Sequence, residues 1–529
     1  MNKNTKESQQ TIGSASLISS AALGGALVGF LLQLTVAYFF GASSKTDAFF
    51  MAQSTSEMLS KLLLGGSITA VFLPMFVNRI AKNRHQEAWQ LGLNILHVTG
   101  CIFIILITLL ALFARPFVAF IAPGFDPVTT DLTVALLRIM LPSFLFLYLV
   151  DLAVSILYSL KSFIVPALLR VIAPAVSLIA VATLTSLIGI YSLAIGVLAG
   201  SCLQLLLVFW TLGRKNFHYR FVFAPLDPAF KKMLRLTYPF LFSVLVTQGA
   251  GIVYRVLVSD LSAGSLSSLK YAEKITQLLA IMFLNSITVV IFPLLSAKSS
   301  QQDFTGMRDT IGYASRLIFL ITLPVIAGII ILRLPLISLL YQHGSFSAAD
   351  TRLTSIALLF LGLGLAINGL SSILGHTVLA LQETRAAVAV SISSQAVAIF
   401  LFVLLTPRMG VAGLALASSL VPLVIAGLYF LYLSRFIPRL HLAYWHSSYP
   451  KIIVLTVAMF FLLRLVFPLL SIFPDQPALS NLIQVIIPII TGAAFYLTAA
   501  YLWRIEEIHD IVAIAKNKLT RSKTPDLTI

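Results

Sequence analysis

The chain has 529 residues, of which 59% are hydrophobic and only 10% are charged. Soluble domains are about 45–50% apolar and about 25% charged, so a soluble fold of this size is excluded. The formal net charge of +17 does not require a nucleic-acid partner, because its distribution is that of a membrane protein with basic loops on one face.

Apolar runs long enough to cross about 30 Å of hydrocarbon as helices recur along the whole sequence. The first run, residues 16–40, is too long for the core of a signal peptide and is expected to be a retained helix. Hydropathy and loop punctuation predict spans at residues 14–41, 46–78, 90–121, 131–159, 163–185, 188–212, 233–259, 265–297, 309–335, 351–380, 386–406, 411–434, 449–470 and 480–503. The sequence therefore predicts an all-α polytopic membrane protein with about fourteen transmembrane helices.

The basic residues are distributed unevenly between alternate connections. If the N-terminus is cytoplasmic, the outer connections hold few basic residues, namely Lys45, Arg115, Arg333 and Arg408. Most of the remaining lysines and arginines then fall on the inner face. By the positive-inside rule, both termini are expected in the cytoplasm, which requires an even number of spans.

An internal repeat supports a duplicated architecture. The segment Ser67–Pro74 recurs as Ser286–Pro293, at an offset of 219 residues, and Gly189–Ala194 recurs as Gly410–Ala415. Six spans duplicated into twelve would form parallel repeats related by an axis along the membrane normal, as in transporters with a substrate site between two lobes. We expect an N-terminal six-helix lobe at 14–212, a second lobe at 233–434, two additional helices at 449–503 and a cytoplasmic tail at 504–529.

The sequence contains no motif that indicates an enzyme. Phosphate-binding loops, nucleophile elbows and clusters with metal-ligand spacing are all missing, so we expect no catalytic residue, no metal and no cofactor. Glycan polymerases and ligases in membranes usually need a sizeable domain outside the bilayer, and no predicted connection is long enough for one.

Charged residues inside the predicted spans are the best functional candidates, because a charge in hydrocarbon costs about 2.5–3.5 kcal/mol or more. Glu57 and Lys61 share one face of the second span and either pair with each other or line a cavity. Arg255, Lys274 and Lys61 would supply three cations suited to a pyrophosphate if their faces point inward. Glu273 is adjacent, and snorkelling to the interface is the alternative for Arg255.

Further positions complete the predicted set. Arg170 is expected near the cytoplasmic mouth of a cavity, with structural pairing as the alternative. Asp151 and His376 are candidates for coupling to H⁺ or Na⁺, and each could instead be a satisfied packing residue. Pro74 and Pro293 are related by the repeat and are the preferred hinge candidates.

Several motifs in order resemble the MurJ/MviN family of the MOP exporter superfamily. They are Gly41–Phe50, Phe72–Pro74, Ala122–Phe125, Phe163–Ala167, Tyr271–Lys274, Gly344–Thr351, Ala380–Arg385 and Gly410–Ala415. In this resemblance, Arg255 and Lys274 match basic positions of the family and Asp47 matches an acidic one, a further cavity candidate. Ala26 and Leu32 stand where the family has arginines.

The resemblance implies a flippase that translocates an undecaprenyl-pyrophosphate-linked glycan, lipid II or a related saccharide, from the cytoplasmic to the periplasmic leaflet. It implies alternating access, a role in peptidoglycan or cell-surface polysaccharide biosynthesis, and a place in the bacterial inner membrane. The expected partners are a polyprenyl-pyrophosphate-linked saccharide, membrane lipids and H⁺ or Na⁺, and a monomer is expected. Two alternatives remain open, a flippase for exopolysaccharide or O-antigen units and a cation-coupled exporter of small molecules like those of the MATE branch.

Overall fold

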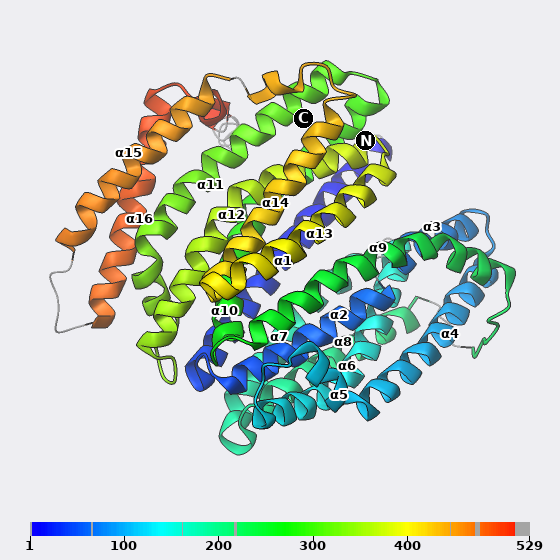
Figure 1. Cartoon of the computed structure of the whole chain (residues 1–529). Coiled ribbons are helices and arrows are strands. Elements are labelled where there is room, and N and C mark those ends of the chain that lie inside the picture. Colours follow the sequence, from blue (N-terminus) through cyan, green and yellow to red (C-terminus); the bar gives the residue numbers. More distant parts are fainter. Residues whose placement is uncertain are drawn as a thin grey trace, which may run out of the picture. The chain divides into compact units, whose positions relative to one another are not determined.

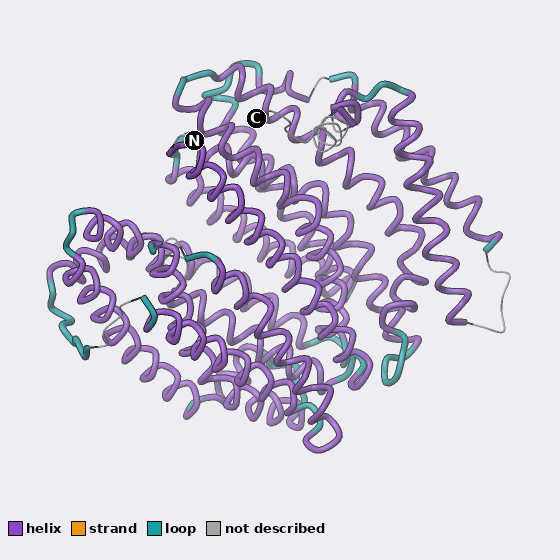
Figure 2. The backbone as a smooth tube through the Cα atoms, turned by 180° about the vertical axis from the view of Figure 1, so that it is seen from behind, coloured by secondary structure: helices purple, strands orange, loops and turns teal. Residues whose placement is uncertain are grey.

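A computed structural model of the chain describes residues 3–64, 67–160, 162–215, 220–444, 446–470, 477–510 and 512–513. Every regular element among these residues is a helix, and Figures 1 and 2 show long helices joined mostly by short loops. The predicted all-α fold is confirmed. The helices belong to two compact units. Unit 1 consists of Met1–Lys274, His343–Asp350 and Phe402–Val411, and unit 2 consists of Ile275–Gln342, Thr351–Leu401 and Ala412–Ile529.

Unit 1 holds the helices of the first half of the chain. They are α1 (Lys3–Phe40), α2 (Ser44–Leu64), α3 (Ser67–Ala81), α4 (His85–Leu112), α5 (Ala114–Ile121), α6 (Pro127–Ser159), α7 (Ile164–Ile188), α8 (Tyr191–Gly213), α9 (Pro228–Ser259) and the first turns of α10 (Ser265–Ser300). Unit 2 holds the remainder of α10, and most of α12 (Ala348–Ala380), α13 (Thr384–Met409) and α14 (Val411–Leu433). It also holds the whole of α11 (Phe304–Tyr341), the 3₁₀ helix η1 (Leu440–Tyr444), α15 (Ser448–Leu469) and α16 (Pro477–Leu502).

Eleven helices of the described chain are long and apolar enough to cross a membrane, or twelve if the two halves of α10, bent by 46°, count as one span. The predicted number of fourteen is therefore not confirmed. The count leaves out α9, and it leaves out α2 and α3, which fall within the second predicted span; residues 65–66 of that span lie outside the described residues. The chain is a multi-pass membrane protein.

The third predicted span, residues 90–121, is divided into the helices α4 and α5. Pro116 lacks an N–H group, and its ring clashes with the carbonyl group four residues earlier in a continuous helix. That residue is Leu112, where α4 ends. The short helix α5 follows, with Ala114, Val118 and Ile121 buried on one face.

Aspartates begin three of the long helices. Asp126 and Asp227 precede prolines at the first positions of α6 and α9, and Asp303 precedes α11. Each carboxylate accepts hydrogen bonds from backbone amides of the first turn, such as Ala229 N at 2.7 Å from Asp227 Oδ1. These caps satisfy donors that the helix itself leaves unpaired.

The repeat seen in the sequence corresponds to repeated turns. Gly189 ends α7 at φ = 57°, and Gly410 ends α13 at φ = 58°, each one or two residues before the next helix begins. A left-handed backbone favours glycine, which has no Cβ to clash with the carbonyl group. The two copies of the sequence motif thus make the same tight helix connection.

Small residues allow the helices of unit 1 to pack closely. A Cβ atom added to Gly196 of α8 would lie 2.9 Å from Ser177 Cα, and one on Gly200 would lie 3.0 Å from the Ala173 carbonyl oxygen, both in α7. Likewise, a Cβ on Gly25 of α1 would lie 2.6 Å from the Arg170 carbonyl oxygen of α7. Helices in membranes associate through such close approaches, since lipid offers little hydrophobic driving force.

In unit 2, α15 and α16 pack against α11. Their shared core includes Leu320 of α11, Leu455 and Met459 of α15, and Tyr496 of α16. An ion pair between Arg316 of α11 and the fully buried Glu507 joins the segment that follows α16 to α11.

Candidate functional site

The site is organised by a carboxylate that joins α2 to the start of α10. Asp47, only 3% exposed, accepts hydrogen bonds from Gly264 N and Ser267 N, both at 2.7 Å, and from the Ser267 hydroxyl. The Tyr271 hydroxyl donates to the Gly41 carbonyl at 2.9 Å, which joins α10 to the turn between α1 and α2. Asp47 is therefore occupied by the N-terminus of α10 and holds that helix in place.

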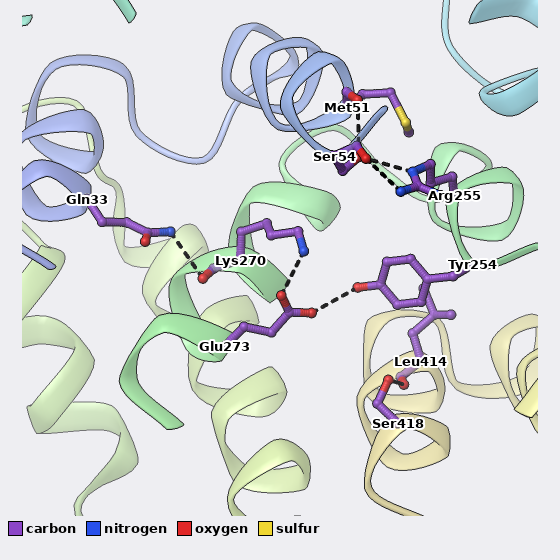
Figure 3. Close-up of polar contacts among 9 residues, drawn as sticks. All are labelled: Gln33, Met51, Ser54, Tyr254, Arg255, Lys270, Glu273, Leu414 and Ser418. Atoms are coloured by element: carbon purple, nitrogen blue, oxygen red, sulfur yellow. Dashed lines mark hydrogen bonds and ion pairs between the residues drawn. The ribbon is translucent and has the colours of Figure 1, made fainter. Parts of the chain in front are cut away.

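Arg255 of α9 is bound to α2 (Figure 3). Its Nη2 donates to the Ser54 carbonyl at 2.8 Å and its Nε donates to the Ser54 hydroxyl at 3.1 Å. Its Nη1 lies 3.5 Å from Met58 Sδ. The residue is 8% exposed, so the guanidinium is buried against α2 and does not extend along the helix to the end of its span.

A second polar group lies at the first turns of α10. Lys270 Nζ donates to Glu273 Oε2 at 2.8 Å, and the Tyr254 hydroxyl lies 3.4 Å from Glu273 Oε1. Gln33 of α1 donates to the Lys270 carbonyl at 3.1 Å. Figure 3 shows these side chains meeting from α1, α9 and α10. Lys270 and Glu273 thus pair with each other, with side chains that are 29% and 37% exposed.

Lys274 lies one turn further along α10. Its ammonium group lies against α1, where a Cβ atom on Gly29 would be 3.0 Å from Lys274 Nζ. Its side chain is half-buried and has no hydrogen bond or ion pair within the part of the chain that the structure describes. A half-buried ammonium group without a resident carboxylate is suited to receive an anion.

Glu57 lies on α2 one turn beyond Ser54 and is exposed. Its carboxylate attracts Arg255, Lys270 and Lys274 electrostatically. No ion pair within 4.0 Å joins Glu57 to these cations among the described residues. We call Glu57, Arg255, Lys270, Glu273 and Lys274 the charge cluster. It belongs entirely to unit 1 and holds one more positive than negative charge.

The other predicted residues lie elsewhere. The Lys61 side chain lies outside the described residues. Arg170 has an exposed side chain on α7, and its backbone touches α1. Asp151 is exposed on α6, and its carboxylate has no hydrogen bond or ion pair among the residues described. Neither Arg170 nor Asp151 is part of the charge cluster.

His376 belongs to α12 in unit 2. Its Nδ1 lies 2.7 Å from the Ser372 carbonyl oxygen, one turn earlier, and the Phe292 ring lies edge-on at 5.5 Å. Nδ1–H therefore donates to the backbone of the preceding turn. Of the hinge candidates, Pro74 lies within α3 and Pro293 within the second half of α10.

Sequence reasoning did not find the partners that hold the cluster. Ser54 and Gln33 are neutral, and their roles depend on helices far away in the sequence. A weak signal existed for Gln33, which is a polar residue within an apolar run. Gly29 shows its importance only through the ammonium group that takes the space of its missing side chain.

Chemically, the charge cluster can bind an anionic group. A guanidinium and an ammonium group from adjacent helices suit phosphate oxygens, and Glu57 sets the balance of charge around them. The described residues contain no group of three or more His, Cys, Asp or Glu side chains placed to hold a metal ion.

Comparisons with known proteins identify the family of the chain. Residues 36–480 match the family described as lipid II flippase MurJ. The probable lipid II flippase MurJ of Rickettsia prowazekii is 25% identical over 416 residues, which cover 77% of this chain and 81% of that protein. The lipid II flippase MurJ of Burkholderia cenocepacia is 26% identical over 420 residues, covering 76% and 79%.

Solved structures give the same result. A lipid II flippase MurJ in an inward closed conformation matches 93% of this chain and 99% of its own, with a TM-score of 0.78 and 25% identity. An inward-facing MATE transporter of the MOP superfamily matches 81% of this chain and 96% of its own, with a TM-score of 0.65 and 16% identity, which shows a shared fold. With the family matched over most of the sequence, the chain is a transporter of the bacterial inner membrane that belongs to the lipid II flippase MurJ family.

Proposed function

We propose that this protein translocates lipid II from the cytoplasmic to the periplasmic leaflet by alternating access, for peptidoglycan biosynthesis. The observation that carries this proposal is the charge cluster, in a chain that belongs to the family. The MATE-like alternative is supported only by the shared fold. The family consists of flippases, so a transport function agrees with it better than an enzymatic one does.

Lys274 and Arg255 would bind the pyrophosphate of the lipid. Lys274 is the first contact, because its ammonium group has no resident partner among the described residues. Arg255 would follow by turning from Ser54 toward the phosphate oxygens, which are charged and therefore stronger acceptors than the Ser54 carbonyl and hydroxyl and the Met58 thioether. Lys61, one turn from Glu57 on α2, is the third proposed cation.

Release of the lipid must be as easy as its capture. Glu57 attracts the same cations that would hold the pyrophosphate, so it competes with the substrate and lowers its affinity. Weak binding of this kind favours turnover, because binding the substrate too tightly in one state slows its exit from that state.

Other expectations remain part of the proposal. We place both termini in the cytoplasm, with a six-helix lobe at 14–212, a second lobe at 233–434 and a tail at 504–529. The lipid tail would stay in the bilayer along the helices of 449–503. Asp151 and His376 are the proposed sites of coupling to H⁺ or Na⁺, Pro74 and Pro293 the proposed hinges, and the functional unit is a monomer.

Complementation tests the proposal directly. A bacterial strain depleted of its own lipid II flippase should grow when it expresses this chain. The double variant Arg255→Ala/Lys274→Ala should fail at equal membrane abundance, whereas Arg435→Ala/Arg439→Ala, which also removes two positive charges, should support growth. No growth with the wild-type chain, together with export of an exopolysaccharide or O-antigen unit in a suitable host, would overturn the lipid II assignment.

A further inference from the structure

A second polar site lies in unit 1, apart from the charge cluster. It is a pocket of about 490 Å³ between the corner that joins α3 to α4 and the connection from α8 to α9. Figure 1 shows these connections at the same end of the unit. Arg79 at the end of α3, Asn94 of α4 and Arg220 of the connection line the pocket. Nothing in the proposed translocation step uses it.

One wall of this pocket is fixed by hydrogen bonds. The Asn94 amide pairs with both backbone groups of Ala224, accepting from its N–H at 2.7 Å and donating to its carbonyl at 2.9 Å. One helical turn further along α4, His97 Nδ1 lies 3.0 Å from the Val222 carbonyl oxygen. Two side chains of a helix therefore hold the backbone of Val222 and Ala224 against α4, which preorganises the pocket before any ligand binds.

The same segment exposes large apolar side chains. Phe221 is 68% exposed and Phe223 49%, and their rings lie nearly parallel with centroids 6.4 Å apart. Leu226 is 74% exposed. At the adjacent end of α8, the exposed Trp210 lies under the Arg214 guanidinium, 3.8 Å from its ring centroid. Tryptophan beside basic residues is typical of the level where hydrocarbon meets head groups, which explains why these apolar side chains are exposed.

Neither arginine of the pocket forms an ion pair with a carboxylate of the described residues. Arg79 uses one N–H group on the Met75 carbonyl, and Arg220 has no polar partner within the described ranges. Two carboxylates, those of Glu87 and Asp227, also line the pocket, but each has another partner, since Asp227 caps α9 and Glu87 Oε2 lies 3.6 Å from Arg84 Nη1. Two guanidinium groups facing a common polar space are suited to bind phosphate oxygens bidentately.

We propose that this pocket binds the phosphate-bearing head group of an anionic phospholipid of the surrounding membrane. Arg79 and Arg220 hold the phosphate, and Phe221, Phe223 and Leu226 contact the glycerol and upper acyl region. A soluble phosphate would leave these apolar side chains in water, so the lipid is the better occupant. The bound lipid bridges α3, α4 and the entry to α9 and stabilises unit 1. Only the choice of leaflet rests on the proposed orientation of the transporter, which makes it the cytoplasmic one.

The test uses the purified, delipidated full chain in detergent, without lipid II. Phosphatidylglycerol or phosphatidylcholine is added, and bound lipid is counted by native mass spectrometry while thermal unfolding is followed in parallel. We expect phosphatidylglycerol to bind more tightly and to raise the unfolding temperature more than phosphatidylcholine. Arg79→Gln/Arg220→Gln should weaken phosphatidylglycerol binding about tenfold or more, since charge-assisted contacts are lost. The control Arg435→Gln/Arg439→Gln, with the same loss of charge outside the pocket, should bind as the wild type does.

A second variant and a soluble ligand identify the occupant. Phe221→Ser/Phe223→Ser keeps both arginines and should also weaken phosphatidylglycerol binding, while glycerol 3-phosphate should bind poorly to every form. Equal phosphatidylglycerol binding by Arg79→Gln/Arg220→Gln and wild type would overturn the proposal. So would glycerol 3-phosphate that binds as tightly as the lipid, because the pocket would then be a site for soluble phosphates. Since lipid II is not present, neither result depends on whether the chain translocates it.

Discussion

Two neighbouring glycines of α1 provide a matched test of how this helix packs. A Cβ atom on Gly25 would lie 2.6 Å from the Arg170 carbonyl oxygen and 3.0 Å from its carbonyl carbon, both backbone atoms of α7. A Cβ on Gly24 would meet only Val171 Cγ2, at an ordinary 3.8 Å. Both Gly24→Ala and Gly25→Ala should gain about 0.5–1 kcal/mol of helix propensity, so the contacts decide the difference between them.

The magnitude follows from the contact distances. To accommodate Gly25→Ala, α1 and α7 must separate by several tenths of an ångström, and overpacking of this kind costs about 1–3 kcal/mol. We therefore expect Gly25→Ala to destabilise the protein by about 1–2 kcal/mol, and Gly24→Ala to be neutral or slightly stabilising. Because α1 also carries Gly29 and Gln33 to the first turns of α10, the shift should reduce lipid II translocation as well.

Thermal unfolding of both variants in the same detergent, followed by intrinsic fluorescence, measures this difference. Gly25→Ala should unfold at a lower temperature than the wild type, and Gly24→Ala at the same temperature or a higher one. If Gly25→Ala proved as stable as Gly24→Ala, the close approach of α1 and α7 would be wrong.

Three further predictions concern single carboxylates. Asp47→Asn should destabilise the protein by about 2–4 kcal/mol in thermal unfolding, since it replaces an acceptor of two backbone amides, while Asp350→Asn, at a half-buried position where the carboxylate accepts one backbone amide, should have a smaller effect. Glu507→Gln breaks a buried ion pair with Arg316 and should cost about 3–5 kcal/mol, whereas Glu506→Gln, 66% exposed, should be close to neutral, and equal unfolding temperatures of the two would contradict the buried pair. The hydrogen bonds from Gly306 N and the Thr305 hydroxyl hold the pKa of Asp303 below its usual value of 3.8. A lowered pKa contributes stability above that value and loses it as the pH falls through the folded-state pKa. The protection factors for hydrogen exchange at the start of α11, which are corrected for the intrinsic exchange rate at each pH, should therefore fall in acid, and Asp303→Asn should remove this pH dependence.

Much of the fold could be predicted from sequence because its signals are local or repeated. Apolar runs give the helices, and the copies at Gly189 and Gly410 make the same left-handed turn. The number of spans was harder to predict. Hydropathy does not register the end of α4 at Leu112, four residues before Pro116, because Leu112, Phe113 and Ala114 are all apolar.

The candidate site could be predicted only in part. Arg255 and Lys274 stand out as charges in apolar runs, and the structure places both in one cluster with Glu57 and Glu273. What each charge contacts depends on tertiary packing, which a single sequence does not reveal. Asp47, expected to line a cavity, is occupied by the first turn of α10, and Arg255 is bound by Ser54, a residue without any charge to mark it.

The central claim is that this chain moves lipid II through contacts with Arg255 and Lys274. The most direct measurement is translocation of labelled lipid II in proteoliposomes that contain the purified protein. The wild-type protein should move lipid II across the bilayer well above protein-free vesicles, and Arg255→Ala/Lys274→Ala should lose most of that activity while remaining folded. Translocation by the double variant at the wild-type rate, or by the wild type no faster than in protein-free vesicles, would contradict the account.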